Sequence, residues 1–316
     1  MAKKVSLVIY GLSILNKENK RALLNDLKDN KSFLDFFLEF VNRTGKKYSN
    51  DSEKETVFQF EQIEVEDVFN DEGQLDYRIL YGRVKTGEYG IESELVNIGT
   101  GAVYHRSKEQ ADVMPFGFCI AIPSGDINSA IIILQALGNY GMKLPLQKRL
   151  QKCITDINPE YNLLMRAIAP KEYLDRYFEH GVLQKIRMIR YEIPEDISNR
   201  MGINYGVKQT KEERIIHKPL GFMEANKKAF QEWRSGQKSY TQIIEIEGYE
   251  YDDLKLEFKL GKTVKTFNLG NLEKLVVSED VTDEVLQSGG HPVFSSLKDK
   301  MKDTAKEYLE GMGLIV

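Results

Sequence analysis

The sequence is poor in cysteine, histidine and long apolar runs, and each shortage excludes a class of protein. The two cysteines, Cys119 and Cys153, lie in apolar surroundings and lack the spacing of a disulfide scaffold or a zinc ribbon. We therefore expect both to be reduced and buried. The four histidines are widely scattered, so no set of Cys and His residues has metal-ligand spacing. We expect no metal and no other cofactor.

No stretch of about 18 apolar residues occurs in the chain, which is the length that a membrane-spanning helix needs. Near the N-terminus, the apolar run Val5–Tyr10 is shorter than the core of a secretory signal peptide and leads into polar residues. We therefore expect a cytoplasmic protein without a membrane partner.

Neither sign of charge is in large excess, because 44 Lys and Arg stand against 48 Asp and Glu. A protein with this balance does not coat nucleic acid by bulk attraction, so any contact with phosphates depends on a local basic surface. Hydrophobic residues make up 41% of the chain and include 15 Phe and 16 Tyr, which is enough to bury a substantial core. A length of 316 residues favours about two domains.

Strand patterns recur along the whole chain with helical patterns between them, which predicts an α+β fold with mixed or antiparallel sheets and packed helices. The run Phe116–Pro123 is apolar at successive positions, as in a central strand, whereas Ile131–Leu137 fits either a strand or a buried helix. From Tyr240 onward, alternating residues predict a β-meander, and an amphipathic helix from about Phe294 follows it.

These patterns also suggest where the domains divide. We expect an N-terminal α+β domain over residues 1–138, and a single interleaved fold is the alternative. The second domain, residues 139–316, combines a central strand–helix–strand segment with the C-terminal meander and helix. Leucines at helical spacing predict a helix over residues 17–29, and a phenylalanine stripe predicts another that begins near Lys31. Residues 195–218 are polar without periodicity, so we expect irregular structure there.

The most coherent polar feature is a group of cations near the middle of the chain. A predicted strand over residues 182–193 places alternate cations on one face, and a predicted helix from Pro145 to Ile154 carries others on its outer side. We expect these cations to form one surface for the phosphates of DNA or RNA, with Tyr161 or Tyr191 available to stack on bases. The expected nucleic-acid-binding residues are Lys148, Arg149, Lys152, Lys185, Arg187 and Arg190.

Two groups of residues are candidates for catalysis. Glu257 and Lys259 form the Glu-x-Lys of a metal-dependent nuclease, which also needs a carboxylate on an adjacent strand, here Asp252 or Asp253. The same pattern arises on any exposed strand face that alternates opposite charges. His105 has basic neighbours, as the base of a metal-independent ribonuclease would, and the alternative is an exposed loop histidine.

Three apolar segments carry a resemblance to known proteins: Phe116–Pro123, Ile131–Gln135 and Ile186–Pro194. In these segments the chain resembles bacterial accessory proteins from mobile elements and anti-phage defence loci. The resemblance implies a bacterial protein associated with defence or conflict. It identifies no catalytic residue.

Three functions remain open at this point. The first is binding of nucleic acid or a nucleoprotein through the local basic surface, in bacterial defence. The second is a ribonuclease-like nuclease effector that uses His105 or the strand with Glu257 and Lys259. The third is a non-catalytic interaction protein whose meander edge or C-terminal helix docks a protein partner or a second copy of the chain.

Overall fold

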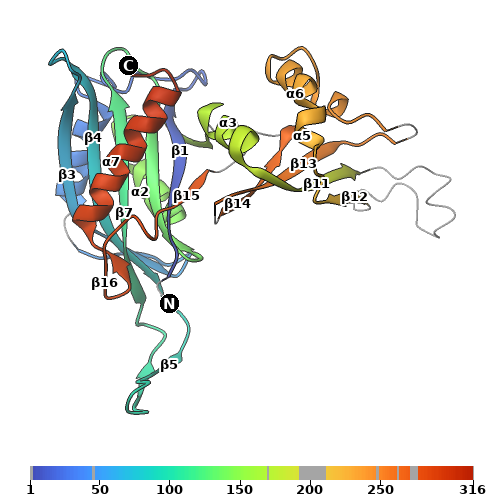
Figure 1. Cartoon of the computed structure of the whole chain (residues 1–316). Helices are drawn as coiled ribbons and strands as arrows, with labels where there is room; N and C mark the ends of the chain where they lie inside the picture. The colour runs from blue at the N-terminus through green and yellow to red at the C-terminus, as the bar shows by residue number, and fades with distance from the viewer. Residues whose placement is uncertain are drawn as a thin grey trace. The chain divides into compact units, whose positions relative to one another are not determined.

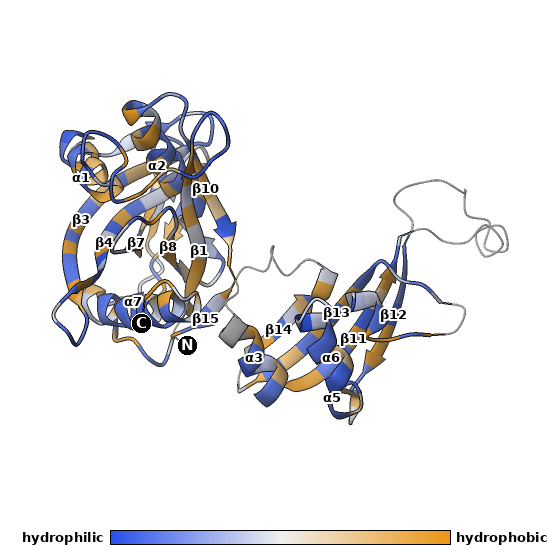
Figure 2. Cartoon of the chain, turned by 90° about the horizontal axis from the view of Figure 1, so that it is seen from above, coloured by the Kyte–Doolittle hydropathy of each residue, from blue (hydrophilic) through white to orange (hydrophobic). Residues whose placement is uncertain are grey.

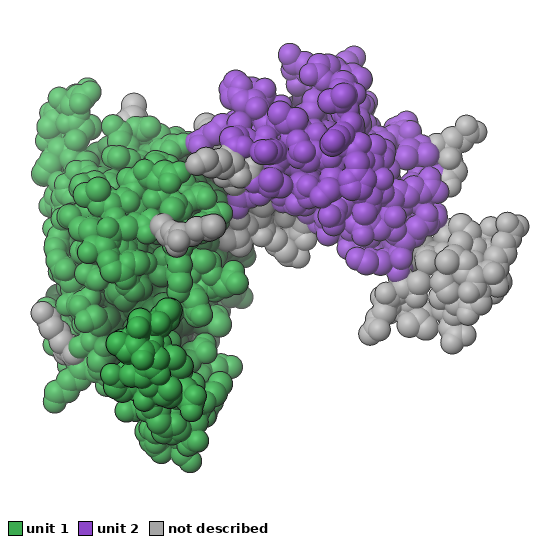
Figure 3. Space-filling view, turned by 60° about the horizontal axis from the view of Figure 1, so that its bottom comes forward, with its two compact units in different colours: residues 1–168, 276–316 green, residues 169–275 purple. Residues whose placement is uncertain are grey.

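The computed structural model describes residues 3–44, 47–168, 171–191, 211–246, 249–261, 263–270 and 277–315. The chain forms two compact units, and each is described by itself (Figure 3). Unit 1 comprises residues 1–168 and 276–316, and unit 2 comprises residues 169–275. Antiparallel sheets with packed helices build both units, which confirms the predicted α+β class.

The units divide near residues 168 and 276, whereas the sequence placed a boundary at residue 138. Gly138 lies in a tight turn between β8 (Ala130–Leu137) and β9 (Tyr140–Gly141), which pair with each other. Residues on both sides of Gly138 therefore belong to one sheet. The predicted second domain combines segments of both units.

One antiparallel sheet of nine strands forms the centre of unit 1, in the order β10-β1-β8-β7-β4-β3-β2, with β15 beside β1 and β9 beside β8. Its central strands are apolar on both faces, as expected for a sheet that is covered on both sides. Besides β8 and β9, the strands of this sheet are β1 (Val5–Leu15), β2 (Ser49–Asp51), β3 (Thr56–Phe69), β4 (Leu75–Glu88), β7 (Asp112–Pro123), β10 (Asn162–Ala167) and β15 (Ser278–Asp280).

Helices cover both faces of this sheet: α1 (Phe33–Thr44) and α2 (Lys143–Ile157) lie on one side, and α7 (Phe294–Gly311) on the other (Figure 2). Phe37 of α1 contacts the ring of Phe118 on β7. The preceding residue on β7, Gly117, faces Leu297 of α7. Successive residues of a strand point to opposite faces, so these contacts place α1 and α7 on opposite sides. The apolar stripe of α7 is buried in unit 1 and is not a free docking surface.

Two small hairpins complete unit 1. β5 (Ser93–Val96) pairs with β6 (Val103–Arg106) and extends beyond the ends of β4 and β7, away from the rest of the sheet (Figure 1). β16 (Gln287–Ser288) pairs with β17 (His291–Pro292) and leads into α7.

Unit 2 is a four-stranded antiparallel sheet with helices packed on one face. The strand order is β12-β11-β13-β14. Phe178 contacts Phe258 and Phe267 of the sheet and Phe230 of a neighbouring helix, which fixes the side that the helices cover. The elements are α3 (Lys171–His180), β11 (Val182–Arg190), β12 (Glu212–His217), α5 (Phe222–Ala225), α6 (Lys227–Arg234), the 3₁₀ turn η1 (Tyr240–Gln242), β13 (Asp253–Leu260) and β14 (Thr263–Asn268).

Several local predictions are changed by the structure. Residues 17–29 form turns and not a helix, because Leu24 bonds through its backbone to Ile127 and Phe33. Ile131–Leu137 is a strand, part of β8. In the segment expected to be irregular, β12 forms beside β11, and residues 195–210 lie outside the described residues. The predicted strand over 182–193 ends at Arg190, and residues 192–194 also lie outside them.

None of the helices among the described residues is long and apolar enough to cross a membrane.

Candidate functional site

The cations predicted to form one basic surface belong to two different units. Lys148, Arg149 and Lys152 lie on α2 of unit 1, whereas the other three lie on β11 of unit 2. The α2 group and the β11 group are therefore on different units of the chain.

In the α2 group, two of the three cations are bound within unit 1. The ammonium of Lys148 pairs with Asp51, and its hydrogen bond lowers the pKa of that carboxyl group. Arg149 donates to Ser49 Oγ over 2.8 Å, and its guanidinium lies 5.3 Å from the centre of the Phe58 ring. Burial lowers the pKa of Arg149. These contacts fasten α2 to β2 and β3, so only Lys152 of this group is exposed without a bonded partner among the described residues.

Arg190 lies on the opposite face of the sheet from Lys185 and Arg187, because strand residues alternate. Its guanidinium pairs with Glu212 at 2.6 Å and lies 4.7 Å from the centre of the Tyr249 ring. Its side chain is only 13% exposed. Arg190 therefore stabilises the helix-covered side of unit 2 and does not join the other two cations.

The face of the unit 2 sheet that points away from Phe178 and the helices is called the open face. Across the β11–β13 ladder, Lys185 stands opposite Glu257 and Arg187 stands opposite Lys255. Residues in directly opposite positions share a face, so the open face gathers both predicted β11 cations. Its charged residues are Lys185, Arg187, Glu213, Asp253, Lys255, Glu257 and Lys259.

Two of the four open-face cations have carboxylate partners. Lys185 Nζ lies 2.8 Å from Glu257 Oε1, and Arg187 Nη1 lies 3.7 Å from Glu213 Oε1. Among the residues that the structure describes, no carboxylate lies within ion-pair distance of Lys255 or Lys259. Among the described residues of the paired strands, this face thus carries four cations against three carboxylates, and Arg187 faces a second cation directly.

An exposed aromatic side chain borders the open face at the end of β11. Tyr191 is 46% exposed, and its hydroxyl donates to Asp253 Oδ2 over 2.6 Å. Its backbone N–H donates to Asp252 Oδ2 over 2.7 Å. The hydrogen bond to Asp253 raises the pKa of Tyr191 to about 12, so the ring stays neutral at physiological pH. A fixed, exposed ring at the end of a strand is a suitable platform for stacking a base, although the charged neighbours of this ring are the carboxylates of Asp252, Asp253 and Glu213.

The residues proposed for a metal-dependent nuclease lie along a single strand. Asp253, Glu257 and Lys259 all belong to β13, and the residue opposite Glu257 is Lys185. A carboxylate on one strand and Glu-x-Lys on its neighbour are therefore not brought together by these residues. Within the described ranges, no group of three or more His, Cys, Asp or Glu side chains is placed to hold a metal ion.

The remaining sequence candidates lie apart from the open face. His105 is exposed on β6, opposite Glu94 in the hairpin of unit 1. Cys119 and Cys153 are free and buried, as predicted, and burial raises the pKa of the Cys153 thiol to about 12.

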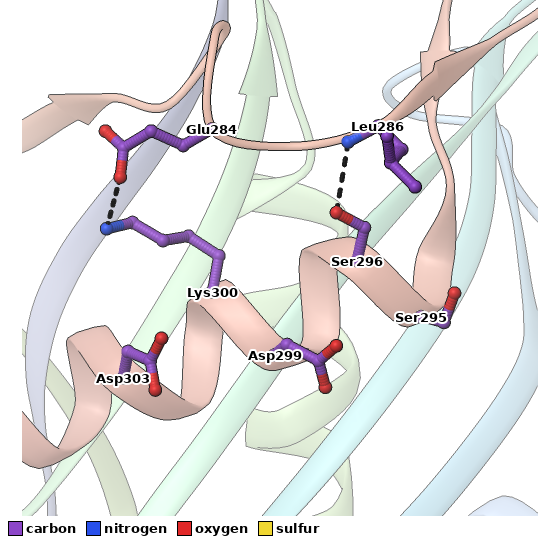
Figure 4. A pocket seen from close by; sticks show the side chains of 7 residues that line it. All are labelled: Glu284, Leu286, Ser295, Ser296, Asp299, Lys300 and Asp303. Atoms are coloured by element: carbon purple, nitrogen blue, oxygen red, sulfur yellow. Dashed lines mark hydrogen bonds and ion pairs between the residues drawn. The ribbon is translucent and has the colours of Figure 1, made fainter.

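A hollow of about 410 Å³ lies beside the N-terminal half of α7 (Figure 4). Lys300 Nζ lies 2.6 Å from Glu284 Oε2, and the N–H of Leu286 donates to Ser296 Oγ over 3.0 Å. These bonds fasten the loop before β16 to α7, so they account for the shape of the hollow. Its lining residues are Glu284, Leu286, Ser295, Ser296, Asp299, Lys300 and Asp303.

Lys255 is the open-face residue that sequence reasoning missed. The strict alternation of residues 254–260 places Lys255, Glu257 and Lys259 on one face, and this signal was available. The pairing of β13 with β11, which sets Lys255 opposite Arg187, was not visible in the sequence. No protein-family model matches this chain, and no curated protein matches its sequence.

Proposed function

We propose that this protein binds single-stranded nucleic acid on the open face of unit 2. The observation that carries the proposal is the pair of like charges formed by Arg187 and Lys255 across the β11–β13 ladder. Like charges in directly opposite positions destabilise a sheet unless an anion lies between them. A phosphate group bound at this pair would neutralise both cations. Lys259 lies on the same face, four residues further along β13, and would contact a phosphate further along the same nucleic-acid strand.

The shape and chemistry of the open face favour a single strand over a duplex. Proteins read unpaired nucleotides with aromatic rings that stack on bases and cations that follow the backbone. Tyr191 supplies such a ring at the end of β11, and the sheet supplies a surface without a helix of the described residues on it. Residues 169–275 carry 19 Lys and Arg against 17 Asp and Glu, so unit 2 is less acidic than the chain as a whole.

The biological setting of this proposal comes from the sequence resemblance to mobile-element and anti-phage defence proteins. In that setting, the nucleic acid is a strand exposed during phage or mobile-element replication. The proposal requires no catalytic step, because binding of phosphates and bases makes and breaks no covalent bond.

A salt titration of the unmodified chain tests the proposal. Fluorescence anisotropy is measured with labelled single-stranded RNA, single-stranded DNA and duplex DNA. We expect a single strand to bind more tightly than the duplex. In a plot of the logarithm of the affinity against the logarithm of the salt concentration, the affinity should fall with a slope of roughly 0.7 per neutralised phosphate. Absence of binding at low salt, or binding that salt does not weaken, would contradict the proposal.

A further inference from the structure

The hairpin formed by β5 and β6 exposes apolar side chains on both of its faces. Leu95 and Tyr104 are paired on one face and are 55% and 61% exposed. Val96 and Val103 are paired on the other face and are 56% and 55% exposed. At the tip, Ile98 is completely exposed. Exposed apolar side chains gathered in this way mark an interaction site more often than scattered ones do.

Hydrogen bonds hold this hairpin in a defined shape. At the tip, Asn97 Oδ1 accepts from the N–H groups of Gly99 and Thr100 over 3.0 and 2.9 Å. At the base, Gly90 N–H donates to the carbonyl of Lys108 over 2.8 Å. The guanidinium of Arg106 donates to the carbonyl of Ile91 over 3.1 Å. The apolar side chains are therefore presented by a structured element and not by a loose loop.

The size and shape of the hairpin indicate what kind of partner surface could cover its apolar side chains. Four residues in each of two strands span about 13 Å by 10 Å, so one face offers on the order of 130 Å². A flat surface, including the same hairpin of a second copy, would cover one face and leave the apolar side chains of the other face in water. An occupant that encloses both faces and the tip, as a cleft does, covers all of them.

The charges around the hairpin decide the chemistry of that cleft. Residues 88–112 contain the carboxylates Glu88, Glu92, Glu94, Glu109 and Asp112 against only two basic side chains, Arg106 and Lys108. This net negative charge repels nucleic acid and the anionic surface of a membrane. A bilayer also offers no hydrogen-bond partners to the free edges of a two-stranded hairpin. A protein cleft with a basic rim attracts these carboxylates and also offers hydrogen-bond partners to the edges of the hairpin.

We propose that the β5–β6 hairpin docks into an apolar cleft with a basic rim on a different protein. Ile98 reaches the floor of the cleft, and the two side-chain pairs contact its walls. The hairpin belongs to unit 1 and the open face to unit 2, so this proposal rests on different residues from the proposed nucleic-acid binding.

Site-specific photo-crosslinking in the cells that make the protein tests this proposal. A photoreactive amino acid replaces Leu95 or Val96, which lie on opposite faces, or the control residue Leu144, which is 75% exposed on α2. We expect both hairpin positions to give the same protein adduct and position 144 to give none. No adduct, an adduct with nucleic acid, or an adduct only with a second copy of the chain would overturn the proposal.

Binding is then measured with the purified full chain and the purified crosslinked protein. Two variants are compared with the unmodified chain: the double variant Leu95→Ser with Tyr104→Ser, and the single variant Ile98→Asp. Each should weaken the affinity by about tenfold or more, as expected when a buried anchor is lost. Leu144→Ser should leave it unchanged. Equal affinity for all variants would overturn the proposal. Binding to a membrane would also overturn it. In that case the chain would float with vesicles of equal parts phosphatidylcholine and phosphatidylglycerol, and the Ile98→Asp variant would not.

Discussion

At the residue scale, the opposed cations Arg187 and Lys255 are the feature on which the proposed binding surface depends. Lys185 and Glu257, the next pair along the same ladder, form an ordinary cross-strand ion pair with a separation of 2.8 Å. The two neighbouring pairs therefore have opposite effects on the sheet. One stabilises it, and the other costs stability that a bound anion would recover.

The first prediction follows from this contrast. Lys255→Gln removes the repulsion and keeps the contact between Arg187 and Glu213, so the free energy of unfolding should rise by about 0.2 to 1 kcal/mol. Lys185→Gln is the matched control and should lower it, because Glu257 loses its partner. Urea denaturation of the full chain measures both. A loss of stability in Lys255→Gln would show that this lysine has a structural role.

At the element scale, β7 and α7 illustrate how close packing depends on small side chains. Gly117, Cys119 and Ala121 occupy the face of β7 that lies under α7. A Cβ atom at Gly117 would lie 2.5 Å from Leu297 Cδ2, which is well inside van der Waals contact. The helix can approach the sheet only because this position lacks a side chain.

Gly117→Ala should therefore destabilise unit 1 by about 1 to 3 kcal/mol, the usual cost of an added methyl group in a packed core. Gly141→Ala is the control, since nothing lies within 4 Å of its Cβ position, and should be close to neutral. Combining Gly117→Ala with Leu297→Ala should cost less than the sum of the two single changes. Strict additivity in thermal unfolding would contradict the described packing.

The attachment of α7 to β3 should make unit 1 sensitive to acid. Hydrogen bonds from Lys298 and Lys302 lower the pKa of Glu64 and Glu66, respectively, below the usual value of about 4.5. Carboxyl groups with a lowered pKa in the folded state contribute stability above their unfolded pKa and lose it as the pH falls through the folded value. The contribution is thus complete near neutral pH and fades below about 4.5.

Replacing Lys298 and Lys302 together by Met should reduce the stability lost between pH 7 and pH 3, measured from denaturation midpoints. Lys306→Met is the control, because Lys306 pairs within α7 with Glu310 at 3.6 Å and does not reach the sheet. An unchanged pH dependence in the double variant would show that these ion pairs do not contribute.

Several elements could be predicted from the sequence because their side chains alone determine them. Phe116–Pro123 is apolar on both faces and forms a central strand, and the phenylalanine stripe forms α1. The leucines of residues 17–29 were misleading, because Leu24 and Leu27 are buried by turns that bond to distant segments. β12 was missed because its polar residues gain strand structure only by pairing with β11.

At the scale of the whole molecule, unit 2 is a continuous segment inserted into unit 1. The chain leaves unit 1 after β10, where Ala167 pairs with Tyr10 of β1. It returns at Val277, whose carbonyl accepts from the N–H of Ile9 over 3.1 Å. The exit and the return thus lie against adjacent residues of one strand. No local pattern indicates this arrangement, because the paired residues lie about 270 positions apart in the sequence.

A chain in which a short Gly/Ser linker replaces residues 169–276 should therefore keep the fold of unit 1. Amide hydrogen exchange should show protection of β1, β7 and β8 as in the full chain, while binding of single-stranded nucleic acid should be lost. Retained binding would place the nucleic-acid surface on unit 1. Failure to fold would show that unit 1 depends on unit 2.

The basic surface was predicted in part. Lys185 and Arg187 were placed together correctly by strand periodicity, whereas Arg190 falls on the other face and the α2 cations belong to another unit. Periodicity determines which residues of one strand share a face, but it does not reveal which strands and helices are neighbours.

The most direct test of the account is a measurement of affinity for a single-stranded oligonucleotide. The double variant Arg187→Gln with Lys255→Gln, called the open-face variant, is compared with the control variant Lys152→Gln. We predict that the open-face variant stays folded, binds at least about tenfold more weakly, and shows a salt slope smaller by roughly 0.7, as expected for one lost phosphate contact. Lys152→Gln should bind like the unmodified chain. Equal affinity and equal salt slope for both variants would contradict nucleic-acid binding at the open face.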